Sequence, residues 1–153
     1  GSHVAHLSTK SEYAIRALVG LALADGAGPV PARDIVAFTG VPPKYLEQVM
    51  AALRKGGLVE SRRGKGGGYL LAVDPASVSF ADVIDLIDGR GAGSATLAGP
   101  PPAAGGRVQE GGQAEALVAP VWREVRECAR AILGSATIAA AAARATRAPM
   151  YHI

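Results

Sequence analysis

Two segments near the start of the chain, residues 10–24 and 31–38, are predicted to be helices, and the first of them carries apolar residues at helical spacing. Ser8 or Thr9 can cap the first helix, because their hydroxyls accept hydrogen bonds from orphan backbone amides. Pro31 suits the first turn of the second, shorter helix, and a Thr-Gly pair ends it. The apolar positions of the first helix are Ala14, Leu18 and Leu21.

A third helix is predicted to begin at Pro42 and Pro43 and to have two different faces. Its apolar positions fall at i, i+3, i+4 and i+7: Leu46, Val49, Met50 and Leu53. Its other side carries Lys44, Glu47, Gln48, Ala51, Arg54 and Lys55. A short helix, a glycine turn and an amphipathic helix with a free outer face are typical of a helix-turn-helix, although any αα-hairpin shares the pattern.

A basic, glycine-rich segment follows the third helix, which Gly57 ends. Residues 58–61 and 69–73 have the composition of short strands, and RRGKGGG joins them. A hairpin directly after a helix-turn-helix is a wing.

Two other interpretations of the glycine-rich segment are disfavoured. A nucleotide-binding P-loop needs GxxxxGK followed by Ser or Thr and a helix, whereas Lys65 precedes glycines and the β-prone Tyr69. A flexible linker needs no apolar flanks that could pair as strands.

The second half begins with a predicted helix over residues 80–88, which Ser79 can cap. Its spaced acids are expected on a solvated face: Asp82, Asp85 and Asp88. Residues 90–116 are rich in glycine and proline and poor in large apolar side chains, and they predict a flexible loop.

An apolar stripe repeats every three or four residues in the C-terminal segment, residues 117–147, with Pro120 at a first turn or a kink. A stripe on so long a helix in so small a domain is expected to be buried against a second subunit. The expected interface residues are Val118, Val121, Trp122, Val125, Cys128 and Ile132.

Charge is unevenly distributed along the 153 residues, whose formal net charge is +3. Residues 8–73 carry nine Lys or Arg and five Asp or Glu, whereas residues 74–153 carry seven and eight. A local surplus of cations is the electrostatic footprint that phosphate backbones require. The chain has neither an 18-residue apolar run nor a secretory signal pattern, so we expect a cytoplasmic protein without membrane attachment.

Several segments resemble the Rrf2 family of bacterial transcription regulators. These are LSTKSEYAIRAL, PPKYLEQVMAALRKGGLVESRRGKGGGYLLA, FADVIDLIDG and PVWREVRECARAILGSATIAA. The resemblance implies a mainly α fold with a small β-hairpin: a winged helix-turn-helix domain at residues 4–89, the loop at 90–116 and dimerisation helices at 117–147. It further implies a regulator, expected to be a repressor, that binds palindromic double-stranded operator DNA as a homodimer.

In such a complex the third helix would occupy the major groove and the wing the adjacent minor groove. Lys44, Tyr45 and Gln48 would reach base edges, with core packing as the alternative role for Tyr45. Arg62 or, preferably, Arg63 would enter the minor groove. Further expected contacts are the wing residues Gly64, Lys65 and Gly66 and the phosphate-binding candidates Ser8, Thr9 and Lys10, for which simple helix capping is the alternative.

Many Rrf2 proteins hold an iron-sulfur cluster through three cysteines in the loop before the dimerisation helix. This loop contains none, and we expect no cofactor and no metal. Cys128 is the single cysteine, either a packed thiol or a redox sensor. We find no cluster of nucleophile, base and orienting residue, so we expect no enzyme. The alternative function is a winged-helix module that binds and modulates a partner protein.

Overall fold

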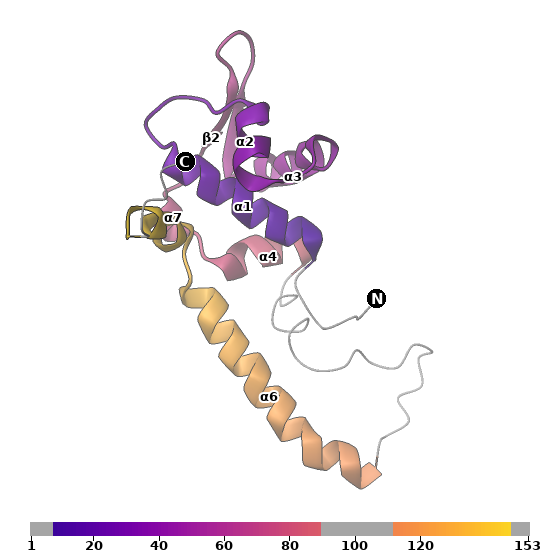
Figure 1. Cartoon of the computed structure of the whole chain (residues 1–153). Helices are drawn as coiled ribbons and strands as arrows, with labels where there is room; N and C mark the ends of the chain where they lie inside the picture. The colour runs from indigo at the N-terminus through magenta and orange to yellow at the C-terminus, as the bar shows by residue number, and fades with distance from the viewer. Residues whose placement is uncertain (1–7, 90–111, 148–153) are drawn as a thin grey trace.

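The computed structural model describes residues 8–89 and 112–147. The elements of the first half are α1 (Thr9–Leu23), α2 (Ala32–Thr39), α3 (Pro43–Lys55), β1 (Val59–Arg62), β2 (Gly68–Leu71), the 3-10 turn η1 (Pro75–Ser77) and α4 (Phe80–Asp88). Two helices follow, α6 (Gly112–Ser135) and α7 (Ile138–Arg147). The expected fold class, mainly α with one small hairpin, is confirmed (Figure 1).

The core forms around α1, which packs against α2, α3, α4 and α7. The apolar positions expected in the first and third helices are all buried: Ala14, Leu18, Leu21, Leu46, Val49, Met50 and Leu53. The opposite face of α3 stays exposed, as the pattern predicted. One buried face and one free face follow directly from the 3.6-residue period.

The helix ends differ from the predictions by a residue or two, for local reasons. Ser8 caps α1 by accepting a hydrogen bond from the Ser11 amide at 3.1 Å. Pro31 is the N-cap of α2 rather than a residue of its first turn. Gly56 is the C-cap of α3, and Gly57 turns the chain toward β1 with a φ of 80°. A left-handed φ of this kind favours glycine.

The hairpin is antiparallel, with Val59 opposite Leu71 and Arg62 opposite Gly68. Val30 extends it, because its backbone exchanges two 2.9 Å hydrogen bonds with Tyr69. This bridge between the loop before α2 and the wing was not predicted. A side chain at position 68 would collide with the Val30 backbone, so a glycine is required there for close approach.

The prediction of an exposed face for the aspartates of α4 is confirmed for Asp82 and Asp88, whereas Asp85 is half-buried; the two exposed aspartates also form hydrogen bonds that were not predicted. Asp82 forms a capping box with Ser79, with hydrogen bonds of 2.9 and 3.1 Å. Asp88 accepts 2.6 Å hydrogen bonds from the hydroxyls of Ser8 and Ser11. These aspartates hold the start of α4 and tie its end to the start of α1.

The C-terminal region also differs from the prediction. α6 begins at Gly112, so residues 112–116 are helical although they were assigned to the loop; the remainder of that loop lies outside the described residues. Pro120 lies inside α6 rather than in its first turn. α7 packs against α1 and buries Ile138 in the core of the same chain. Among the described residues no helix is long and apolar enough to cross a membrane.

Candidate nucleic-acid interface

The exposed face of α3 presents side chains that can form hydrogen bonds with base edges. Lys44 and Gln48 are both exposed and lie one helical turn apart, on the same side of the helix. Neither makes a hydrogen bond or ion pair with another described residue. Their donors and acceptors are therefore free for an external partner.

Tyr45 lies differently from its neighbours in the first turn of α3. Its side chain is half-buried, and its ring meets the ring of Tyr13 edge to face, with centroids 5.3 Å apart and planes at 84°. This packing anchors the start of α3 on α1. The geometry therefore gives Tyr45 a packing role, and its contact with a base stays a prediction.

The wing carries three exposed cations. Arg62 forms a 3.2 Å ion pair with Glu60, whereas Arg63 and Lys65 have no polar partner within the described part of the chain. The tip is closed by a 2.9 Å hydrogen bond from the Gly67 amide to the Gly64 carbonyl. Of the two wing arginines, Arg63 is thus the one whose guanidinium has no ion-pair partner among the described residues.

The wing and α3 are neighbours. The Leu58 amide donates to the Leu53 carbonyl at 3.0 Å, so β1 follows α3 directly. Arg54, in the last turn of α3, donates from Nη1 to Ser61 Oγ on β1 at 3.2 Å. Figure 1 shows the hairpin projecting from the body next to α2 and α3. The structure therefore brings the two predicted contact elements together and leaves the wing exposed.

The start of α1 is less open than the sequence suggested. The Ser8 hydroxyl already caps the helix and donates to Asp88, so a carboxylate already lies beside the start of α1, where the helix dipole favours an anion. Thr9 is exposed and Lys10 is partly exposed. Phosphate contact at these two positions stays a prediction.

Two arginines near this surface were not predicted from the sequence. Arg33, in the first turn of α2, is exposed and borders a hollow of about 300 Å³ between α2, α3 and β2, with Glu47 and Tyr69 also on its wall. Arg16, on α1, contacts the end of α2. The sequence signal for Arg33 was its place in the helix before α3. Arg16 gave no signal, because its contact is distant in sequence.

α6 carries the predicted dimerisation stripe, and that stripe is uncovered. In Figure 1 the helix extends away from the other elements. All six predicted interface residues are exposed, and Leu117 joins them at 77% exposure. An apolar row of this extent on a projecting helix marks an interaction surface.

The chain shows similarity to known proteins. The Rrf2 family model, described as an iron-dependent transcriptional regulator, matches residues 7–144. The HTH-type transcriptional regulator IscR of Escherichia coli O1:K1 / APEC is 48% identical over 82 residues, which are 54% of this chain and 51% of that protein. The match therefore spans about half the length of such curated relatives.

Similarity to solved structures covers more of the chain than the match to the curated relatives does. IscR of T. potens has a TM-score of 0.72 and 32% identity, covering 95% of this chain and 92% of that one. CymR of B. subtilis, described as the global cysteine regulator, has a TM-score of 0.67 and 28% identity, covering 90% and 96%.

Iron, which the family description names, needs protein donor atoms to hold it. The chain contains one cysteine, Cys128, which is exposed on α6. Within residues 8–89 and 112–147, no three His, Cys, Asp or Glu side chains are grouped so as to hold a metal ion. Iron-sulfur clusters are held by several thiolates, so this donor set does not fit such a cluster within one chain.

Proposed function

The chain belongs to the Rrf2 family of transcriptional regulators, and on that premise we propose that it binds double-stranded operator DNA as a homodimer and represses transcription by occupying the site. The observation that carries this proposal is that two exposed surfaces lie next to each other: the outer face of α3 and the wing beside it. A helix fits the major groove, and an arginine on an exposed hairpin suits the narrow minor groove next to it.

Base reading would begin at the N-terminal half of α3. Gln48 can pair in a bidentate manner with adenine, and Lys44 can reach guanine or a phosphate. Arg63 would enter the minor groove, where A·T-rich sequence makes the potential most negative. Thr9, Lys10 and the newly identified Arg33 would contact phosphates and fix the register.

The second copy of the chain would cover α6. The helix is 24 residues long, and its apolar side chains lie along one face without a cover in the described structure. Packing α6 against its counterpart would bury this stripe and pair two winged domains through a two-fold axis. A two-fold protein reads a roughly palindromic site, with half-sites about one or more helical turns apart.

The regulator would act without an iron-sulfur cluster, since one thiol cannot supply the ligand set within the chain. Absorption spectroscopy of anaerobically prepared protein checks this point. A spectrum with protein bands alone is expected, and a visible iron-sulfur band would contradict it.

The central experiment selects binding sequences from a random duplex pool and then measures Kd for the best sequence and a scrambled one over a range of salt. We expect an inverted repeat, bound at least about 1,000-fold more tightly than the scrambled duplex, with a steep salt dependence. Sequence-indifferent, millimolar binding would instead favour the winged-helix module that acts on a partner protein.

A further inference from the structure

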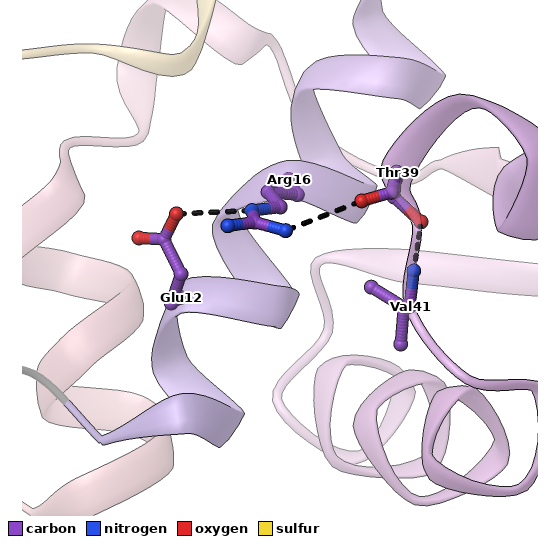
Figure 2. Close-up of polar contacts among 4 residues, drawn as sticks. All are labelled: Glu12, Arg16, Thr39 and Val41. Carbon is purple, nitrogen blue, oxygen red and sulfur yellow. Dashed lines mark hydrogen bonds and ion pairs between the residues drawn. The ribbon is translucent and has the colours of Figure 1, made fainter.

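Arg16 lies on α1. This helix contacts both α2 and α3, the two helices of the helix-turn-helix. The Nε of Arg16 donates to Glu12 Oε1 at 3.0 Å, one helical turn earlier. Its Nη1 donates to the carbonyl oxygen of Thr39 at 3.3 Å. Figure 2 shows the guanidinium lying between these two partners. The planar fork of an arginine can hold two acceptors at once, which the single ammonium of a lysine cannot do as well.

Thr39 is the last residue of α2, and it organises the turn into α3. Its Oγ1 donates to the Ile35 carbonyl at 2.6 Å. The same oxygen accepts a 3.2 Å hydrogen bond from the Val41 amide, which Figure 2 shows. Its own carbonyl is one of the orphan acceptors at a helix C-terminus. Pro42 and Pro43 follow and have no N–H to donate. The arginine therefore supplies the donor and the positive charge that this helix end lacks.

The same guanidinium also reaches toward the start of α3. Its Cζ lies 5.7 Å from the ring centroid of Tyr13, within cation–π distance. The Tyr13 ring in turn supports Tyr45 edge to face. One side chain thus contacts the end of α2 directly and the beginning of α3 through Tyr13.

We propose that Arg16 is a positioning residue for base reading: it locks the α2–α3 turn and thereby sets the angle at which α3 presents Lys44 and Gln48. This inference rests on the proposed function. Each contact alone would contribute little at a partly exposed site, since the Arg16 side chain is 47% exposed. Their combination on one rigid fork constrains the junction between two helices, where a small rotation moves every base-reading side chain.

The test compares Arg16→Met with Arg144→Met in the full chain. Arg144 is an exposed arginine of α7 without a polar partner in the described structure, so both variants lose the same charge. We expect Arg16→Met to lower affinity for the selected operator about tenfold, the cost of roughly one weakened base contact, and to leave affinity for unrelated duplex unchanged. The control should change neither.

Two readouts separate positioning from direct contact. If Arg16 touched a phosphate, its loss would weaken both duplexes alike and reduce the salt slope by about one, and this outcome would overturn the inference. If Arg16 positions the turn, the slope is unchanged and the Gly40 and Val41 amides exchange hydrogen faster in Arg16→Met without DNA. Exchange rates equal to those of wild type would also overturn it.

Arg16→Lys keeps the charge and guards against a folding defect in the methionine variant. We expect it to recover only part of the operator affinity, because one ammonium cannot hold both acceptors as well as the planar fork does; full recovery would contradict a role for the fork. If the wild-type chain selects no operator, the proposed function fails and the reading role with it, while the exchange rates still decide whether Arg16 holds the turn.

Discussion

Gln48 offers the most direct test of base reading, because its amide both donates and accepts. Gln48→Ala should weaken operator binding by about 1–3 kcal/mol and relax the preference at one base pair. The side chain is exposed and has no partner in the described structure, so stability should not change. Binding to a set of single-base operator variants measures the effect. Gln113→Ala, at an exposed glutamine of α6, is the matched control, and unchanged discrimination in Gln48→Ala would remove this residue from the interface.

The two wing arginines are adjacent in sequence, but only one of them forms an ion pair with a described residue. Arg62 is paired with Glu60 at 3.2 Å, and Arg63 has no such partner among the described residues. Arg63→Ala should therefore cost more operator affinity than Arg62→Ala, by about 1 kcal/mol or more, and should reduce the preference for A·T pairs beneath the wing. Gel-shift titrations with A·T and G·C flanks check both points. Equal losses in the two variants would contradict the assignment.

Elements whose cause is local could be predicted from the sequence. Helical periodicity placed Leu46 and Met50 in the core, and glycine-rich turn chemistry placed the wing. Contacts between distant segments left no local signal, because each partner is individually ordinary. The hydrogen bonds from Ser8 to Asp88 and between Val30 and Tyr69 are of this kind.

The candidate site divides in the same way into residues with a local sequence signal and residues without one. Exposed polar side chains on a periodic helix and cations on a glycine-rich hairpin are visible as sequence patterns, so Gln48 and Arg63 could be named as candidates in advance. Arg16 could not, because its role depends on a carbonyl that the fold brings to it from 23 positions later in the chain.

The wing depends on a close backbone approach at Gly68, and this gives a stability prediction. In Gly68→Ala the added methyl group would meet the Val30 carbonyl, so the strand and the loop before α2 must separate. We expect a loss of about 1–3 kcal/mol in the free energy of unfolding, measured by urea denaturation. Gly134→Ala is the control, because its Cβ meets no atom within 4 Å and alanine favours a helix. Equal stability of Gly68→Ala and wild type would contradict the close approach.

The two C-terminal helices have different partners. α7 is held to the winged domain by its packing on α1 and by hydrogen bonds from Phe80 to Ala136 and from Ile138 to Val78, at 2.8 and 3.0 Å. α6 precedes it and keeps an uncovered apolar row. A helix anchored at one end to a DNA-reading domain and free along its length is well placed to fix the distance between two such domains.

That arrangement predicts the effect of charge on the apolar row of α6. In the proposed dimer, Val125→Asp would bury an unpaired negative charge between the apolar rows of two α6 helices, so the dimer should dissociate. Each chain should stay folded, because Val125 is 37% exposed in the single chain. Light scattering measures the mass, and operator affinity should fall at least about 100-fold because the two half-sites are no longer linked. Ala116→Asp is the matched control: it adds the same charge about two and a half helical turns away, on the opposite face of α6. A Val125→Asp protein that keeps the wild-type mass would exclude this helix from the interface.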